Sequence, residues 1–275
     1  MEPLADLHLH TTYSDGALSP YELIRKAHGA GLRIISITDH DSVGAIDEAS
    51  DLAKEFDLEI VPGMELSATV NQSEVHILGY FMDYHDKALL EALALFREKR
   101  LRRAERIVGK LNRMNIPLSI ETVIANAAGN AIGRPHIAIA MVNEGHAQSY
   151  HQAFNKYLGD GRPAYERKEE FSPEETVRLI ADAGGLSFLA HPGNSLDDTL
   201  LARLISSGLD GIEVVHPSHS PALVNYYRGI VNEYCLMECG GSDFHGGLKG
   251  DDEILGRFGI PPASVEIMRR RLYPN

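Results

Sequence analysis

The sequence predicts an α/β fold that is interrupted by an all-helical segment, and two observations support this prediction. Short strands and amphipathic helices alternate in the first 85 residues and again after residue 161, whereas only helical patterns occur between these stretches. Alternating strands and helices with short loops are typical of an α/β sheet or barrel. We therefore expect an α/β domain built from residues 1–85 and 162–275, with residues 86–161 as a helical insertion.

Strands and helices of the N-terminal stretch can be placed in order. Residues 4–10 alternate between apolar and polar side chains, as a strand does. Ser19 and Pro20 begin a helix, because serine is a favoured N-cap and proline fits the first turn, and this helix should end near Gly29. The remaining elements are strands over 33–38, 59–65 and 74–80 and a helix over 43–55 that begins at an N-cap serine, Ser42.

The central and C-terminal stretches differ in their pattern. A long charged helix is expected over 89–114, followed by shorter helices over 117–127 and 135–143. The alternation resumes at Ser172 and Pro173, which begin a helix for the same reason as Ser19 and Pro20. The elements of this last stretch are helices over 173–183, 196–207 and 221–234 and strands over 186–190, 211–215 and 236–240.

Composition and charge exclude several classes of function. The formal net charge of −13 disfavours a large basic surface for long nucleic acids, so we expect no stable nucleic-acid complex. No stretch approaches the ~18 apolar residues of a membrane span, and the first residues lack the features of a signal peptide. The chain has two cysteines, four positions apart, which is not a metal or redox spacing. We expect a cytoplasmic protein without membrane association.

Histidines and carboxylates recur at or near the ends of the expected strands. The chain has 13 histidines, and histidine is the commonest metal ligand. In α/β barrels and open sheets, the carboxyl ends of the strands meet at one rim, so residues distant in sequence converge there. The residues placed in this way are His8, His10, Asp39, His40, Asp41, Glu65, His76, His191, His216, Asp243 and His245.

The spacing of these residues predicts a metal site. Residues two apart on a strand point to the same face, so His8 and His10 can reach one ion, and Asp243 and His245 repeat the arrangement. Nitrogen and carboxylate ligands together favour zinc, manganese or iron over calcium. A carboxylate that bridges two ions would give a site that activates water and holds a phosphoryl group. The residues thus predict a metal site of a kind that can hydrolyse phosphate esters.

Six stretches of the chain, in order, resemble the PHP (polymerase and histidinol phosphatase) domain family. They are residues 6–16, 37–41, 62–65, 76–79, 190–192 and 241–245. The resemblance implies a distorted (β/α)7 barrel, similar to a TIM barrel, that holds two or three divalent metal ions. Mn²⁺ is the expected metal, with Zn²⁺ or Fe²⁺ as alternatives. The family's ligand positions correspond here to His8, His10, Asp15, His40, Glu65, His76, His191, Asp243 and His245.

By analogy with the family, Glu65 would bridge two of three ions. His8, His10 and Asp243 would bind one ion, His76 and His191 the second, and Asp15, His40 and His245 the third. All nine positions carry residues that can bind a metal, which argues for an active enzyme and against a non-catalytic regulatory module. We expect catalytic roles for three residues, Asp15, His191 and His136.

The helical insertion narrows the expected substrate. With residues 133–138, it resembles the insertion of PHP proteins that remove the 3′-phosphate from 3′,5′-bisphosphonucleotides such as adenosine 3′,5′-bisphosphate. Arg134 would bind the second phosphate, because a guanidinium grips phosphate through paired hydrogen bonds. His136 would contact phosphate or donate a proton to the leaving oxygen. The alternatives are a 5′→3′ exoribonuclease on short RNA oligonucleotides, a histidinol phosphatase and a non-catalytic metal-binding module.

Overall fold

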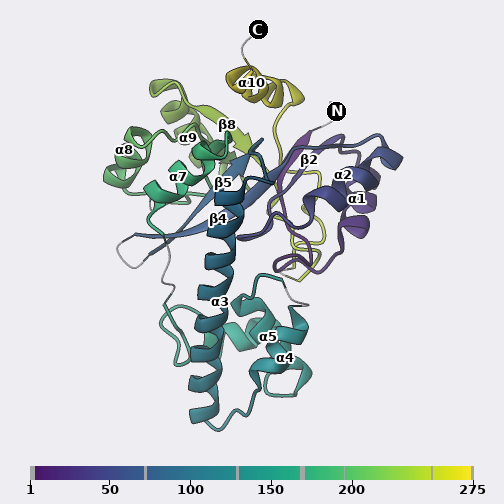
Figure 1. Ribbon diagram of the computed structural model, residues 1–275, viewed down its shortest axis with the longest axis vertical. Coiled ribbons are helices and arrows are strands. Elements are labelled where there is room, and N and C mark those ends of the chain that lie inside the picture. The colour runs from purple at the N-terminus through teal and green to yellow at the C-terminus, as the bar shows by residue number, and fades with distance from the viewer. Residues whose placement is uncertain are drawn as a thin grey trace.

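The computed structural model describes residues 4–70, 73–127, 130–167, 171–194, 196–248 and 250–273. A body of strands flanked by helices lies above a smaller helical body, and α3 runs through both (Figure 1). The strands are β1 (Ala5–Leu9), β2 (Ile34–Ile37), β3 (Glu59–Ile60), β4 (Gly63–Val70), β5 (Ser73–Tyr80), β6 (Leu186–Leu189), β7 (Gly211–Val215) and β8 (Met237–Gly240). The helices are α1 (Pro20–Gly29), α2 (Ile46–Ala53), α3 (Lys87–Arg113), α4 (Ile120–Asn126), α5 (Arg134–Asn143), α6 (Tyr150–Ala153), α7 (Pro173–Asp182), α8 (Asp198–Ser206), α9 (Pro221–Glu233) and α10 (Pro262–Leu272).

Two sheets close into a distorted barrel. One sheet has the order β1-β2-β3 and the other β4-β5-β6-β7-β8. The backbone N–H of Asp41, after β2, donates to the carbonyl of Glu65 on β4 at 2.9 Å, and that of His10, after β1, donates to the carbonyl of Phe244, after β8, at 3.0 Å, so the two sheets are joined on both sides. β5 runs antiparallel to β4 and to β6, while the other strand pairs are parallel. The predicted α/β fold, a distorted TIM-like barrel, is confirmed.

Local signals in the sequence explain where α1 and α7 begin. The hydroxyl of Ser19 accepts a hydrogen bond from the backbone N–H of Glu22 at 3.3 Å, and the Glu22 carboxylate accepts one from the Ser19 N–H at 2.9 Å. This reciprocal pair is a capping box, and it stabilises the first turn by satisfying two N–H groups. Ser172 forms the same pair with Glu175 before α7. The serine–proline starts predicted for both helices are confirmed.

Three expectations about local structure were wrong or incomplete. Ser42 does not cap α2: its hydroxyl accepts from the N–H of Gly44 at 3.3 Å, which forms a turn, and the helix begins only at Ile46. The single strand expected over 59–65 divides into β3 and β4, with Pro62, which has no N–H to pair, between them. The C-terminal helix α10 was not predicted.

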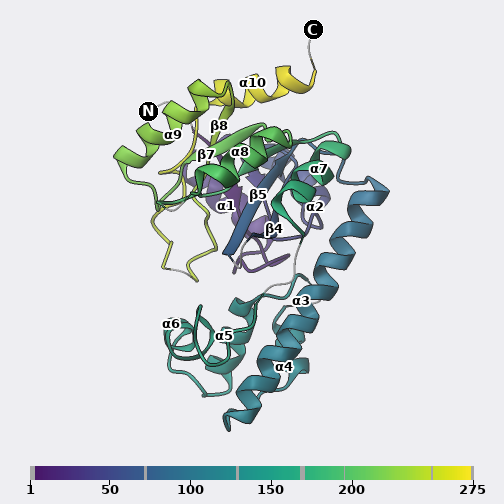
Figure 2. The ribbon, with the colours of Figure 1, turned by 90° about the vertical axis from the view of Figure 1, so that its left-hand side faces the viewer.

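The insertion has a hydrophobic core of its own, and α3 contributes to two cores. Leu89 and Leu93 of α3 pack in the core beneath β4 and β5, whereas Ile107 and Leu111 pack with α4 and α5. Figure 2 shows α3 passing along the barrel and α4–α6 packing beside its lower half. This separate core supports the division of the chain at residues 86 and 161, which stays a prediction.

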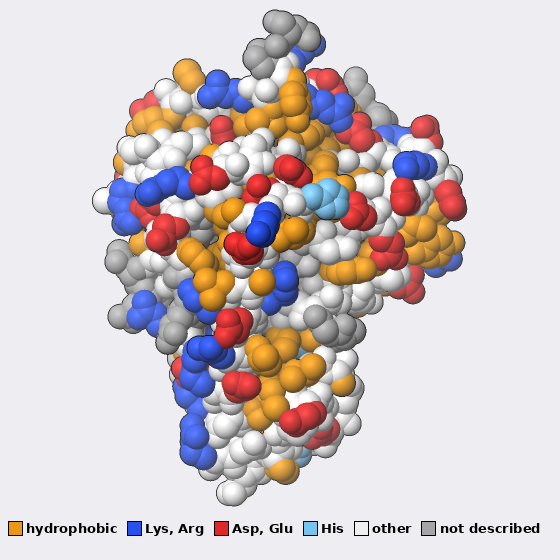
Figure 3. Space-filling model, viewed as in Figure 1, with side chains coloured by type: hydrophobic (Ala, Val, Ile, Leu, Met, Phe, Trp, Pro, Cys, Tyr) orange, Lys and Arg blue, Asp and Glu red, His pale blue; other side chains and the backbone are white. Residues whose placement is uncertain are grey.

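In Figure 3, basic side chains gather along the left side of the lower, helical body, where α3 lies. Arg102 pairs with Glu98 one helical turn away, and Arg106 and Lys110 pair with Glu166. Ion pairs of this kind belong to a solvated helix face. None of the helices in the described part of the chain combines the length and apolar character that crossing a membrane requires.

Candidate metal centre and active site

All nine residues predicted as metal ligands lie together at one rim of the barrel. Their ligand atoms form four overlapping groups within the described part of the chain, and in each group the atoms lie within 4.8 Å of one another. The groups are His10, Asp15, His40 and His245; His8, His10 and Asp243; His8, Glu65 and His191; and His40, Glu65 and His76. The predicted convergence of strand ends therefore occurs, and we refer to these nine residues as the ligand cluster.

Glu65 lies at the centre of the ligand cluster. Its Oε1 is 2.7 Å from Nδ1 of His76 and 3.0 Å from Nε2 of His191. Its Oε2 is 2.9 Å from Nδ1 of His40 and 3.4 Å from Nε2 of both His8 and His10. Each oxygen thus faces its own set of histidines, as a carboxylate that bridges two ions would.

Electrostatics keep the central carboxylate ionised. Burial alone would raise the pKa of Glu65, but the neighbouring His40, His76 and His8 hold it well below its usual range. Burial also opposes ionisation of Asp243, and the positive charges of His245 and His8 outweigh it, so that the pKa of Asp243 is well below normal. Both groups are therefore anionic at neutral pH.

The two aspartates of the ligand cluster lie on different sides of His10. Asp243 Oδ1 is 3.1 Å from Nε2 of His10, while Asp15 Oδ1 is 3.8 Å from its Nδ1 and 3.3 Å from Nε2 of His245. Burial, together with the charge of His245, lowers the pKa of His10 to about 4, so this imidazole is neutral and able to bind a metal. His10 and His40 each belong to two of the four groups, whereas the family analogy gave each of them one ion.

The unsatisfied buried atoms of the ligand cluster fit divalent metal ions. Several buried ligand atoms lie close to a carboxylate oxygen or to a histidine nitrogen, as given above, yet form no hydrogen bond among the residues that the structure describes. They are Nε2 of His8 and His10, Nδ1 of His40, both ring nitrogens of His76 and Oε2 of Glu65. A buried polar atom without a partner is costly, and coordination of a cation by these lone pairs removes the cost. The mixture of nitrogen and oxygen donors matches manganese, zinc or iron.

A buried glutamate that the sequence did not single out supports two of these histidines. Glu213 on β7 lies with Oε1 2.9 Å from Nδ1 of His8, and its Oε2 accepts a hydrogen bond from the backbone N–H of His191 at 2.7 Å. It is completely buried. A carboxylate in the middle of an otherwise apolar strand is rarely buried without a partner, and this was the available signal.

The acidic residues that flank His40 turn away from the ligand cluster and hold the loops around it. Asp39 accepts hydrogen bonds from the hydroxyls of Thr11 and Ser14, both at 2.5 Å. Asp41 binds the guanidinium of Arg100 on α3 at 2.5 Å. Their strand-end positions were noted in the sequence, but their partners lie on other elements and could not be read from it.

A histidine after β7 joins the site. Nε2 of His216 lies 3.5 Å from Oδ2 of Asp243, and its ring centre is 5.3 Å from that of His191. His219 lies nearby but binds the backbone: its Nδ1 contacts the carbonyl oxygen of Val214 at 2.9 Å. His216 therefore extends the ligand cluster, and His219 supports the loop.

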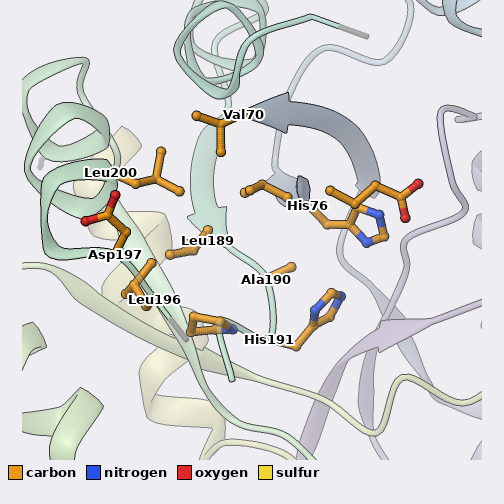
Figure 4. Close-up of a pocket in the computed structure, with 11 residues that line it drawn as sticks. Val70, His76, Leu189, Ala190, His191, Leu196, Asp197 and Leu200 are labelled. Atoms are coloured by element: carbon orange, nitrogen blue, oxygen red, sulfur yellow. The ribbon is translucent and has the colours of Figure 1, made fainter. Parts of the chain in front are cut away.

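Two cavities open beside the ligand cluster, and His76 and Glu74 line both. The first, of about 180 Å³, lies between the cluster and the insertion. The residues lining it are Asp15, His40, Glu74, His76, Arg100, Arg103, Gly133, Arg134, Pro135, Tyr150 and Phe154. The second, of about 420 Å³, lies on the side of His191. Figure 4 shows His76 and His191 on one side of it and Leu196, Asp197 and Leu200 on the other.

Arg134 and His136 occupy the first turn of α5. The guanidinium of Arg134 lines the smaller cavity, binds Asp160 at 2.6 Å and lies 3.6 Å from Glu74. His136 is buried, and its Nδ1 accepts a hydrogen bond from the backbone N–H of Gly133 at 3.0 Å. The structure thus brings Arg134 to the cavity, while His136 caps the helix that carries it. The substrate contacts of both residues stay predictions.

Comparison with known proteins agrees with this geometry. The family model of the PHP domain matches residues 6–158. A 3′,5′-nucleoside bisphosphate phosphatase of Chromobacterium violaceum is 33% identical over 96% of this chain and 95% of its own length. The 5′-3′ exoribonuclease Rnm of Escherichia coli is 34% identical over 95% of this chain and 91% of its own.

A solved structure extends the likeness to three dimensions. A predicted metal-dependent phosphoesterase from Bifidobacterium adolescentis is 32% identical and superposes with a TM-score of 0.90, covering 97% of this chain and 96% of its own. The relatives match nearly the whole chain, and the family model matches more than half of it. The protein is therefore a metal-dependent phosphoesterase of the PHP domain family.

Proposed function

We propose that this protein removes the 3′-phosphate from 3′,5′-bisphosphonucleotides, giving the nucleoside 5′-monophosphate and inorganic phosphate. Adenosine 3′,5′-bisphosphate is the leading substrate. The proposal is supported by the name of the Chromobacterium violaceum relative, which is 33% identical over nearly the full length of both chains. It rests mainly on the position of Arg134 beside the ligand cluster.

The smaller cavity suits a molecule with two phosphates. Its lining combines Asp15, His40 and His76 of the ligand cluster with three arginines, Arg100, Arg103 and Arg134. A phosphoryl group at the cluster would leave the rest of the nucleotide in reach of the arginines. Arg134 also stands at the first position of a ten-residue helix, where the helix dipole attracts anions. The second phosphate would displace the carboxylates of Asp160 and Glu74 from the guanidinium.

The chemistry divides between the protein and its ions. Divalent ions, when bound, would supply an activated water and neutralise charge on the phosphoryl oxygens. Glu65, Asp15 and the histidines of the cluster are the residues that would hold those ions at the barrel rim. Arg134 fixes the distal phosphate, which orients the 3′-phosphate for attack. The bond from phosphorus to the 3′-oxygen breaks, a bond to the water oxygen forms, and the 3′-oxygen leaves with a proton.

His191 lines the larger cavity and Asp15 lines the smaller one. We assign both to the catalytic machinery because each belongs to a ligand group and lines a cavity that substrate can enter. The burial of His136 and its bond to Gly133 favour a role in holding α5, and through it Arg134, over direct contact with the phosphate.

Release of phosphate from a panel of nucleotides tests the proposal. Purified protein is analysed for bound metal, loaded with Mn²⁺, Zn²⁺ or Fe²⁺, and given adenosine 3′,5′-bisphosphate, 3′-AMP, 5′-AMP and histidinol phosphate. Arg134 would form two charge-assisted hydrogen bonds with the second phosphate, which 3′-AMP lacks. At about 1.5 kcal/mol each, these bonds should make kcat/KM for the bisphosphate about 100-fold higher than kcat/KM for 3′-AMP. Release from histidinol phosphate without release from the bisphosphate would overturn the proposal.

Short 5′-phosphorylated RNA is the second candidate substrate. The Escherichia coli relative, a 5′-3′ exoribonuclease, is as similar to this chain as the phosphatase is. The observation that favours it is the larger cavity beside His76 and His191. A mononucleotide bound between the cluster and Arg134 would leave this cavity unfilled.

A further inference from the structure

Asp15 is held in the ligand cluster differently from the other residues of its group. The backbone around His10, His40 and His245 is attached to the sheets, because each lies in or next to a pairing with a neighbouring strand. Asp15 lies instead in a turn over residues 12–15 that belongs to no strand. Turns are more mobile than the elements they connect, so this ligand needs support from elsewhere. We refer to residues 12–15 as the Asp15 turn.

The insertion bonds to the backbone carbonyls of the Asp15 turn. The side-chain Nδ2 of Asn130 donates to the carbonyl oxygen of Thr12 at 2.8 Å. The backbone N–H of Ala131 donates to the carbonyl oxygen of Tyr13 at 3.5 Å. A backbone carbonyl that is cut off from water is costly without a donor, so these contacts favour one position of the turn. They join two segments that lie 118 positions apart in the chain.

His136 supplies a third contact through the other nitrogen of its ring. Its Nδ1 accepts a hydrogen bond from the N–H of Gly133, and burial lowers the pKa of His136, so the ring is neutral with its proton on Nε2. The ring also bonds to the backbone of Ser14. The N–H of Ser14 already bonds to the carbonyl of Thr11 at 3.0 Å, so the carbonyl of Ser14 is the acceptor. His136 therefore links the start of α5 to the residue before Asp15.

The barrel holds the same turn from its other side. Asp39 accepts hydrogen bonds from the Ser14 hydroxyl at 2.5 Å and from the backbone N–H of Thr11 at 2.8 Å. These bonds fix the side chain of Ser14 and the residue before the turn, but they leave the carbonyls of the turn to the insertion. Asp15 follows Ser14 directly, and neighbouring Cα atoms lie only ~3.8 Å apart, so a shift of Ser14 moves Asp15 with it. The position of Asp15 thus depends on both parts of the protein.

We propose that the insertion positions Asp15 for metal binding, with His136 and Asn130 as positioning residues that act through the Asp15 turn. Residues 130–136 would hold the Asp15 carboxylate where it completes its ligand group. Arg134 lies within the same segment and lines the same cavity as Asp15. The insertion would thus have a second task besides presenting Arg134, because the ion of this group would bind more weakly without these contacts. This inference does not depend on the identity of the substrate.

Two substitutions at position 136 separate this link from the capping of α5. His136 stands at the third position of the helix, where glutamine and glutamate can both accept the hydrogen bond from the Gly133 N–H. Only glutamine also carries N–H groups that can donate to the carbonyl of Ser14. A negative charge near a cation would by itself strengthen metal binding, so weaker binding in His136→Glu cannot come from its charge.

Calorimetric titration of metal-free protein with Mn²⁺ tests the inference. Asp15→Ala identifies the binding step that belongs to the group of Asp15. We expect His136→Glu and Asn130→Ala to weaken that step by about tenfold or more, as loss of a supporting contact does, and the other steps by less than about threefold. His136→Gln should match the parent. Asn143→Ala, at the exposed end of α5, is the matched control for Asn130→Ala and should also match the parent.

The rate of hydrolysis gives a second readout. The substrate is p-nitrophenyl phosphate, a phosphomonoester without a second phosphate for Arg134 to bind. His136→Glu should lose activity when Mn²⁺ is limiting and should regain it when Mn²⁺ is raised to saturation, because the ligands of the ion are all still present. His136→Gln should follow the parent at both concentrations.

Three results would overturn the inference. If the step identified by Asp15→Ala is unchanged in His136→Glu and in Asn130→Ala, the insertion does not position Asp15; Asn130→Ala decides alone if His136→Glu does not fold. If all steps weaken equally, the loss is one of general structure. If Asp15→Ala removes no step, its group binds no ion. None of these results concerns the substrate, so the proposed function stands or fails separately.

Discussion

The carboxylate of Glu213 lies 2.9 Å from Nδ1 of His8, and both side chains are completely buried. Burial raises the pKa of Glu213, but the neighbouring charge of His8 outweighs it and holds the pKa below its usual value. An ionised carboxylate can only accept, so His8 donates through Nδ1, and a metal ion at the ligand cluster would take the place of the proton on Nε2. The other oxygen of Glu213 holds His191, whose φ of +25° is uncommon for a residue with a side chain.

Replacement of Glu213 should therefore weaken metal binding. Glu213→Gln retains the size of the side chain and removes the charge that fixes the tautomer of His8. Loss of such a supporting contact typically costs 10–100-fold in metal affinity, and we expect a loss in that range by calorimetry with Mn²⁺. Glu233→Gln, on the exposed face of α9, is the control. Unchanged affinity in Glu213→Gln would show that the ligand histidines orient themselves without it.

A side chain at position 241 should disturb the junction between β8 and β1. A Cβ on Gly241 would lie 2.4 Å from Cβ of His8 and 2.5 Å from its backbone nitrogen. Gly241→Ala should displace His8, lowering the free energy of unfolding by about 1–3 kcal/mol, as overpacking does, and weakening Mn²⁺ binding. Gly229→Ala on α9 is the matched control, because its Cβ would meet nothing within 4 Å. Urea unfolding that ranks the two variants equally would contradict the prediction.

Arg134 should contribute to binding of the second phosphate, and not to hydrolysis of the 3′-phosphate at the ligand cluster. Arg134→Lys retains the charge but loses the paired donors of the guanidinium, so KM for adenosine 3′,5′-bisphosphate should rise about tenfold, and more in Arg134→Ala. The rate on 3′-AMP, which has no second phosphate, should change by less than about threefold. Steady-state kinetics measure both, with the exposed Arg102→Lys as control. Equal losses of activity on both substrates would contradict the prediction and would mean that Arg134 supports the structure of the site and not the binding of the second phosphate.

Arg100 joins the insertion to the barrel through a buried ion pair. Its guanidinium binds Asp41 at 2.5 Å and the hydroxyl of Ser67 at 2.9 Å, and it is 7% exposed. Arg100→Ala leaves the buried Asp41 without that counter-charge, so the free energy of unfolding should fall by about 3–5 kcal/mol. Arg102→Ala, two positions away and exposed, should cost less than about 0.5 kcal/mol.

A double variant shows whether charge is the cause. Asp41→Asn combined with Arg100→Met removes both charges and should recover most of the stability that Arg100→Ala loses, because replacing a buried pair is far less costly than breaking it. Urea unfolding of metal-free protein measures the stability of Arg100→Ala, Arg102→Ala and the double variant. If the double variant is as unstable as Arg100→Ala, the loss comes from packing and not from an uncompensated charge.

The residues of the ligand cluster could be predicted from the sequence, whereas the contacts of the residues that support the site, such as Glu213 and Asp41, could not. His8, Glu65 and His191 could be placed because each lies in or directly after a strand, and the ends of parallel strands meet by geometry. Glu213 acts through His8, 205 positions away in the chain, and no local pattern reports that contact. The same holds for Asp41, whose partner lies on the long helix.

Local boundaries failed where two signals competed. Ser42 has the side chain of an N-cap, but its hydroxyl bonds within the preceding turn, so the helix starts four residues later. The strand expected over 59–65 fits an extended pattern, yet Pro62 cannot continue a hydrogen-bonded ladder.

Because β5 runs antiparallel to its neighbours, only certain insertions and deletions in α3 would keep Arg134 at the ligand cluster. Tyr80, its last residue, pairs with the first residues of β4 and β6, so the chain leaves the barrel at the end opposite to the ligand cluster. α3 must travel back along the barrel to carry the insertion to the rim, and its 27 residues span about 40 Å. Between its two packed halves, deletion of a single residue would rotate the insertion by about 100°. Arg134 would then swing away from the cluster, so α3 can gain or lose residues there only in near-whole turns.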